Sequence, residues 1–173
     1  MSRGLLFDSA RKKTANDGRR SWRARQSSAT FMSRSEGDPE VFMKVLVIDD
    51  DDIVRLVMVE SLEEAGFDVV DLPSPIGATK TIVDNEIEAV AVDVLMPGMS
   101  GDKLSQLLRK NPRLADIGIV LVSSMEPTEL ERLREESGAD EIVQKDDVRT
   151  LLPTALKRSV RFRRRSGGVV GAN

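Results

Sequence analysis

The sequence predicts an α/β domain in which five parallel strands form one sheet and helices cover both of its faces. Two observations lead to this prediction. Across residues 44–163, apolar runs of strand length alternate at short spacing with helix-length segments, which is the pattern of βαβ units. The first run, KVLVI at 44–48, is almost continuously apolar, as expected for a parallel strand that is covered on both faces.

The first half of the domain begins with this strand at 44–48. Residues 51–65 are expected to be helical, because the segment opens with acidic residues that the helix dipole favours and a glycine follows it. FDVVDL at 67–72 predicts the second strand. Two prolines then open a turn that leads into a second helix near 76–85.

The central part repeats this alternation. EAVAVD at 88–93 predicts a third, buried strand, and VLMPGMSG at 94–101 is a loop rich in Pro and Gly. A helix is expected at 102–110, and IGIVLVS at 117–123 predicts the fourth strand.

The last part holds a helix at 128–137, a short fifth strand at 140–144 and a final helix at 147–163. Pro153 lies inside this final helix, where it should kink the helix or restart it. With right-handed crossovers, the common arrangement for five such strands is the doubly wound, flavodoxin-like order 2-1-3-4-5.

The composition excludes several chemistries. The chain of 173 residues has no Cys and no His, so it has no disulfide, thiol nucleophile, zinc ribbon or imidazole base. Any metal is expected to be a hard cation bound by oxygen. No apolar run reaches the roughly 18 residues of a membrane span, and no signal peptide is recognisable. The sequence therefore predicts a cytoplasmic protein without a membrane partner.

The charges divide the chain into three parts. Residues 1–42 hold 9 Lys/Arg and 5 Asp/Glu, residues 43–156 hold 11 and 24, and residues 157–173 hold 6 and none. An acidic folded part would repel phosphates, so no nucleic-acid partner is expected. Sparse, unpatterned apolar residues predict that 1–42 is a disordered basic extension. It is either an upstream addition with translation starting at Met43 or Met32, or an Arg-rich targeting or docking arm. The domain is expected at 43–163 and a disordered tail at 164–173.

Polar residues stand where the predicted strands end. Asp49 and Asp50 follow the first strand, Asp93 closes the third, Ser123 the fourth and Lys145 the fifth. In doubly wound sheets the working site lies at these carboxyl ends. Carboxylates crowded together need a countercharge, for which an oxygen-preferring ion such as Mg²⁺ is suited. An oxygen nucleophile, a metal, an ammonium and a hydroxyl are the parts that phosphoryl transfer uses.

Four motifs in order, VLVIDD (45–50), DVLMPGMSG (93–101), VLVSS (120–124) and GADEIVQK (138–145), give the chain its family resemblance. Over about 44–160 it resembles the response-regulator receiver domain, the CheY-like phosphoacceptor module of two-component signalling. The resemblance implies a Mg-dependent phosphorelay protein that is not a true enzyme, has at most weak autophosphatase activity and switches protein–protein contacts. Its implied partners are a sensor histidine kinase or a histidine phosphotransferase, and a downstream protein target. Only 13 residues follow 160, so a stand-alone receiver without a DNA-binding output domain is expected.

The resemblance also assigns roles to individual residues. Asp93 would be the phosphoacceptor, and Mg²⁺ would be bound by Asp50, Asp93 and the backbone carbonyl of Leu95. Asp49 would act through metal-bound water. Ser123 would hydrogen-bond the phosphoryl group, and Lys145 would pair with one of its oxygens.

Two positions depart from the family pattern. Asp146 stands where the family usually has a proline after a cis peptide, and Ile142 stands where it has a switch aromatic. These changes put the conventional output through the last strand in doubt. They mildly favour an alternative, a receiver fold that is an interaction module without phosphorylation. A second alternative is a haloacid-dehalogenase-like phosphatase with Asp49 and Asp51 as its Asp-x-Asp pair, but this leaves Asp93 without a role.

The helix at 51–65 predicts a partner surface. Its apolar residues spread over most of its circumference, more than a half-buried helix needs. The usual core stripe accounts for Val54, Val57, Met58 and either Leu62 or Ile53, so Leu56 and Val59 are expected to point outward. They would form a docking patch for a kinase or phosphotransferase helix, or for a homodimer.

Overall fold

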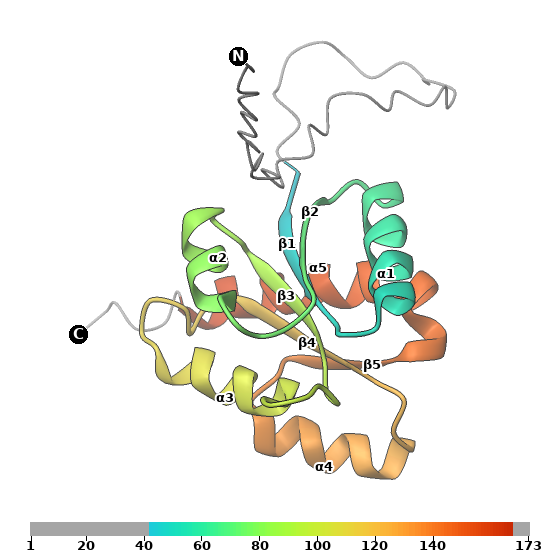
Figure 1. Ribbon diagram of the computed structural model, residues 1–173. Helices are drawn as coiled ribbons and strands as arrows, with labels where there is room; N and C mark the ends of the chain where they lie inside the picture. The colour runs from blue at the N-terminus through green and yellow to red at the C-terminus, as the bar shows by residue number, and fades with distance from the viewer. Residues whose placement is uncertain (1–41, 168–173) are drawn as a thin grey trace, which may run out of the picture. The chain divides into compact units, whose positions relative to one another are not determined.

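The computed structural model describes residues 42–167, which form a five-stranded parallel sheet in the order β2-β1-β3-β4-β5 (Figure 1). The predicted fold class and strand order are confirmed. The strands are β1 (Lys44–Ile48), β2 (Asp68–Leu72), β3 (Ala89–Asp93), β4 (Gly118–Ser123) and β5 (Glu141–Gln144). The helices are α1 (Asp52–Glu64), α2 (Ala78–Asp84), α3 (Gly101–Lys110), α4 (Pro127–Ser137) and α5 (Val148–Gly167).

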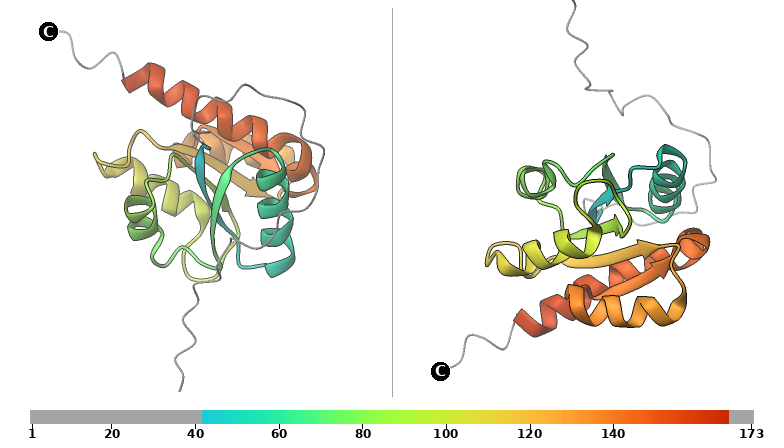
Figure 2. Two further views of the ribbon diagram at one scale, coloured as in Figure 1. Left: turned by 90° about the horizontal axis from the view of Figure 1, so that it is seen from above. Right: turned by 60° about the horizontal axis from the view of Figure 1, so that its bottom comes forward.

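Two apolar cores lie on the two faces of the sheet. Figures 1 and 2 show α1 and α5 on one face and α2, α3 and α4 on the other. β3 contributes to both cores, because Ala89 and Ala91 face α1 and α5 while Val90 and Val92 face the opposite layer. All five residues of β3 are buried. This double burial explains why the sequence of the strand is continuously apolar.

The ends of the elements differ from the predicted ranges by at most two residues, except at the end of α5. α5 continues through Gly167, so the first four residues of the predicted tail are helical. Most of the predicted extension at 1–42, and residues 168–173, lie outside the described residues. None of the helices within 42–167 is long and apolar enough to cross a membrane.

Pro153 lies inside α5 rather than at the start of a new helix. A proline within a helix leaves the carbonyl four residues earlier without its usual N–H donor. Here that carbonyl belongs to Arg149, and the Ser61 hydroxyl from α1 donates to it at 3.2 Å. A side chain of the neighbouring helix therefore replaces the missing hydrogen bond, and α1 and α5 are joined at this point.

Candidate functional site

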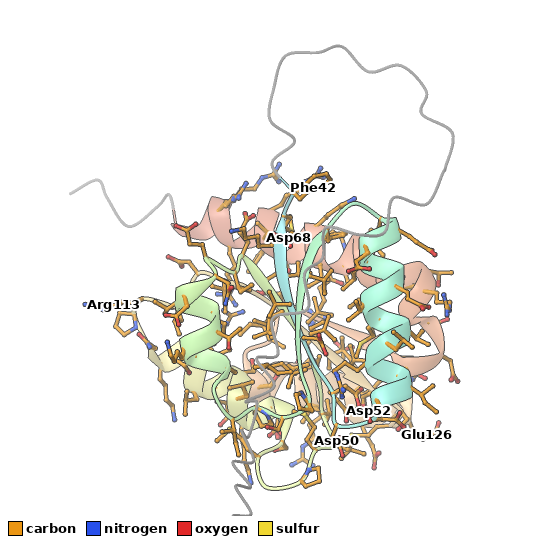
Figure 3. All side chains as sticks on the ribbon, turned by 45° about the horizontal axis from the view of Figure 1, so that its top comes forward. Phe42, Asp50, Asp52, Asp68, Arg113 and Glu126 are labelled. Carbon is orange, nitrogen blue, oxygen red and sulfur yellow. The ribbon has the colours of Figure 1, made fainter. Side chains whose placement is uncertain are left out.

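Three charged groups meet at the carboxyl end of the sheet. The Lys145 ammonium lies 2.9 Å from Oδ2 of Asp49 and 3.2 Å from Oδ1 of Asp93. Asp49 is 0% exposed and Asp93 is 2% exposed. Asp50 is exposed, and it offers a carboxylate oxygen within 4.8 Å of oxygens on the other two. Figure 3 shows Asp50 at this edge, with Phe42 and Asp68 at the opposite end of the domain.

The electrostatics of the site follow from this sharing of one ammonium. Burial raises the pKa of Asp93, and the nearby Asp49 adds to the rise while Lys145 opposes it. Burial alone would lower the pKa of Lys145, but hydrogen bonding and charge attraction from Asp49 and Asp93 outweigh it and leave that pKa raised. Two buried carboxylates and one exposed carboxylate thus face a single cation, and the site retains an excess of negative charge.

These donors fit a hard divalent cation such as Mg²⁺. Apart from the Lys145 ammonium, neither Oδ2 of Asp49 nor Oδ1 of Asp93 has a hydrogen-bond partner among residues 42–167. All ligand atoms of the cluster are carboxylate oxygens, which Mg²⁺ prefers over nitrogen or sulfur. The acidic cluster that the sequence predicted is therefore assembled in a form that suits the predicted metal.

The backbone around Asp49 is fixed by the acidic run that follows it. Oδ1 of Asp49 accepts a hydrogen bond from the Asp51 N–H at 2.9 Å. The Asp51 carboxylate accepts from the N–H groups of Ile53 and Val54 and so caps α1. Asp51 is thus part of the helix start, as the sequence indicated, rather than the second member of a phosphatase Asp-x-Asp pair.

Arg55 is a residue of the site region that the sequence reasoning missed. Its Nη1 donates to the backbone carbonyl of Asp49 at 2.7 Å, and its Nε donates to Asp71 at the end of β2 at 2.9 Å. A third bond reaches Asp52 in the first turn of α1. One side chain therefore ties together β1, α1 and β2. The signal in the sequence was an arginine three residues after an acid in a predicted helix.

Gly101 holds the other acidic strand end in place. A Cβ on this residue would lie 2.2 Å from the backbone oxygen of Asp93. The Gly101 N–H donates to the carbonyl of Val94 at 3.1 Å. Because it has no side chain, the start of α3 can pack directly against the backbone of Asp93. Leu95, in the loop between them, has an exposed side chain, and its backbone N–H opposes the rise in the pKa of Asp93.

Ser123 lies at the same edge of the sheet, on the strand next to Asp93. In the register of β3 and β4, Asp93 pairs with Val122, so Ser123 is one residue further along. Ser123 is fully buried, and its Oγ accepts a hydrogen bond from the Met125 N–H at 3.1 Å. The structure therefore brings four of the predicted residues into one cluster and places Ser123 on the adjacent strand end.

The two departures from the family pattern have clear local structures. Residues Lys145–Asp147 form a single 3-10 turn, so Asp146 lies within a turn, and no cis peptide occurs within residues 42–167. Ile142 is half-buried and packs against the core on the α2–α4 side. The last strand thus ends in ordinary trans backbone and presents a branched aliphatic side chain in place of a ring.

The predicted partner surface on α1 needs one correction. Leu56 is exposed, as expected, but Val59 is half-buried and packs against the core. The outward-facing residue next to Leu56 is instead Ile53, which is 75% exposed. The core stripe is wider than the periodicity indicated because α1 packs against both β2 and α5.

Comparisons with known proteins agree with this geometry. The family model of the response regulator receiver domain matches residues 45–157. A cyclic di-GMP phosphodiesterase of Thermotoga maritima is 30% identical over 122 residues, which is 70% of this chain and 32% of that protein. The phosphate regulon transcriptional regulatory protein PhoB of Pseudomonas aeruginosa is 28% identical over 103 residues, 58% of this chain and 44% of that protein. The chain therefore spans less than half of the length of each of these relatives.

Solved structures show the same fold. A sensor protein from Polaromonas sp. JS666 is 30% identical with a TM-score of 0.62, covering 69% of this chain and 97% of that one. A response regulator receiver domain protein from Clostridium thermocellum, at 21% identity, has a TM-score of 0.64 and covers 72% and 99% of the two chains. Together with the match over most of the folded residues, these findings show that the chain belongs to the response regulator receiver domain family of two-component systems.

Proposed function

We propose that this chain accepts a phosphoryl group on Asp93 from a phosphohistidine of a sensor histidine kinase or a histidine phosphotransferase. The observation that supports it most directly is the pair of buried carboxylates, Asp49 and Asp93, that share the Lys145 ammonium beside Asp50. Burying charge in this way costs stability and is typical of functional sites. The proposal explains why the fold keeps it.

In the proposed step, an oxygen of the Asp93 carboxylate forms a bond to phosphorus while the phosphorus–nitrogen bond of the phosphohistidine breaks. The electron pair of that bond stays on the imidazole nitrogen, which takes a proton from solvent. Lys145 would pair with one phosphoryl oxygen, and the Ser123 hydroxyl would donate to another. Both groups stabilise the negative charge of the transferring phosphoryl group.

A metal would bind to the Asp50 and Asp93 carboxylates and the backbone carbonyl of Leu95, with Asp49 acting through metal-bound water. When bound, Mg²⁺ would neutralise the negative charge that the phosphoryl group brings into an already acidic site. The part of this chain's own residues is to orient the acceptor. Arg55 fixes the backbone at Asp49, and Gly101 allows α3 to pack against Asp93.

The outcome of phosphorylation is proposed to be a change in protein contacts, and no nucleic-acid contact is proposed for the domain itself. Docking of the phosphodonor is proposed on α1, where Ile53 and Leu56 are exposed one turn apart. Neither Asp146 nor Ile142 removes a group that the proposed transfer uses. The complete acidic cluster therefore favours phosphorylation more strongly than these two departures favour an interaction module without phosphorylation.

The test is labelling by acetyl phosphate in the presence of MgCl₂, followed by intact-mass spectrometry. Wild type is expected to gain one phosphoryl group, and Asp93→Asn is expected to gain none. Asp68→Asn, a change in an exposed aspartate at the opposite end of the domain, is the matched control and should label like wild type. Labelling of Asp93→Asn at the wild-type rate would refute the assignment.

A metal titration tests the ligand set separately. Asp50→Asn should weaken Mg²⁺ binding, because a hard cation that gives up its water reluctantly needs charged ligands. Unchanged Mg²⁺ affinity in Asp50→Asn would place the metal elsewhere.

A further inference from the structure

We propose that Gln144 is a positioning residue that sets the place of the Ser123 hydroxyl for phosphorylation at Asp93. This inference rests on the function proposed above and assigns a role to a side chain that the acidic site does not include. Gln144 is the last residue of β5, directly before Lys145. Its Nε2 donates a hydrogen bond to the backbone carbonyl of Met125, in the loop between β4 and α4, at 3.2 Å.

The hydrogen bonds continue from Met125 to Ser123. The Met125 N–H donates to Oγ of Ser123 at 3.1 Å, while its carbonyl is bound by Gln144. Ser123 and Gln144 are also direct neighbours in the register of β4 and β5. The loop is thus held at both backbone polar groups of Met125, its N–H and its carbonyl. Because Oγ of Ser123 accepts from Met125, its own hydroxyl proton remains available for a donor role.

β5 directs its side chains to both faces of the sheet. Val143 belongs to the core on the α1 and α5 side. Ile142 and Gln144 point to the other side, where they line an open surface pocket of about 430 Å³ together with Leu130 of α4. Lys145, the next residue, reaches Asp49 and Asp93. The last residue of β5 therefore holds the loop of the site's hydroxyl, and the residue directly after it supplies the ammonium.

The loop needs such an anchor because α4 holds it weakly. No side chain caps the start of α4, and few of the helix's described residues are buried, Leu130 being the buried apolar one. An open pocket at the surface also lies between α4 and β5. Ile142 lines this pocket with an aliphatic side chain, which offers the loop no hydrogen bond. Within residues 42–167, the amide of Gln144 is the side-chain donor that joins β5 to the loop.

The test compares Gln144→Met with wild type in the full-length chain. Methionine has about the same length but no N–H donor. The rate of labelling by acetyl phosphate is expected to fall about fivefold, which corresponds to ~1 kcal/mol for one hydrogen bond. Mg²⁺ affinity should stay at the wild-type value, since the carboxylates are unchanged. A general loss of structure would lower both.

Gln106→Met is a matched control. Gln106 also donates its Nε2 to a backbone carbonyl, that of Glu136, at 3.2 Å, but between α3 and α4. The same substitution there removes the same kind of bond and should leave the labelling rate unchanged. An equal loss of rate in both variants would overturn the proposal.

A double-mutant cycle with Ser123→Ala identifies the route of the effect. If Gln144 acts through the hydroxyl, Gln144→Met will lower the rate in the wild-type background and have no further effect in Ser123→Ala. The proposal is overturned if the fivefold loss persists without the hydroxyl, or if Gln144→Met labels at the wild-type rate. If wild type itself takes no label on Asp93, it is the proposed function that fails, and this inference falls with it.

Discussion

Replacing Gly101 with alanine should impair the acceptor at Asp93 without touching any charged group. The added Cβ would lie 2.2 Å from the backbone oxygen of Asp93 and 3.0 Å from its carbonyl carbon. The obstacle is backbone rather than the tip of a side chain, so either α3 or the end of β3 must move by about 1 Å to reach an ordinary contact distance. Such overpacking typically costs about 1–3 kcal/mol of stability.

The larger effect is expected on the reaction. A displacement of about 1 Å at reacting atoms can cost on the order of 10²-fold in rate. Gly101→Ala should therefore label with acetyl phosphate roughly ten to a hundred times more slowly than wild type, while thermal unfolding shows a still folded domain. The rate is measured by intact-mass spectrometry at saturating Mg²⁺.

Gly118→Ala provides the comparison. A Cβ at Gly118 would meet Oγ of Ser159 at 2.3 Å, a contact between β4 and α5 that is just as close. Gly118 lies at the start of β4, away from the carboxyl end of the sheet, and the Ser159 hydroxyl can rotate away. The Gly118→Ala variant should lose stability but keep the wild-type labelling rate. Wild-type rates in Gly101→Ala, or equal losses in the two variants, would refute the reasoning.

Three further changes test the electrostatics and the docking face. Lys145→Met leaves two buried carboxylates without their cation, so the unfolding free energy measured without Mg²⁺ should fall by about 3 kcal/mol; an unchanged value would show that the ion pair does not stabilise the fold. The pKa of Asp93 is raised in the folded protein, so the protonated carboxyl favours the fold and the ionised one opposes it. The contribution of Asp93 to stability is therefore complete below its unfolded pKa of 3.8 and is lost as the pH rises through its folded pKa. Asp93→Asn should therefore melt higher than wild type at neutral pH, and the difference should shrink in acid melts. The double change Ile53→Glu, Leu56→Glu should slow transfer from a protein phosphodonor at least tenfold and spare labelling by acetyl phosphate. Equal rates with both donors would place docking elsewhere.

The fold was predictable from the sequence because its central strands, β1, β3 and β4, are buried on both faces. The side chains of AVAVD at 89–93 enter both cores in turn. The strand is therefore apolar at consecutive positions, and this run predicts a buried parallel strand. The acidic cluster was predictable for a related reason. Parallel strands end at one edge of the sheet, so Asp49, Asp93 and Lys145 meet there wherever the helices lie.

The features that the sequence did not reveal depend on tertiary contacts. Arg55 reaches β2, sixteen residues away, and no local pattern encodes that reach. Val59 was assigned to the exposed face because a single core stripe was assumed, whereas α1 packs against two neighbours. The link from Gln144 to Met125 joins two strand ends, and a polar residue at the end of a strand has no periodicity that would distinguish it.

The three hydrogen bonds of Arg55 hold the start of α1 against the ends of β1 and β2. A partner helix that docks on Ile53 and Leu56, as proposed, would spend little binding energy on ordering this surface, because Arg55 already ties the start of α1 to β1 and β2. The same side chain holds the carbonyl of Asp49, next to the acidic cluster. Arg55 thus ties the proposed docking face to the Asp49 side of the acidic cluster. For the proposed phosphodonor, a misplaced contact on α1 would therefore also misplace the phosphoryl group relative to the acidic cluster.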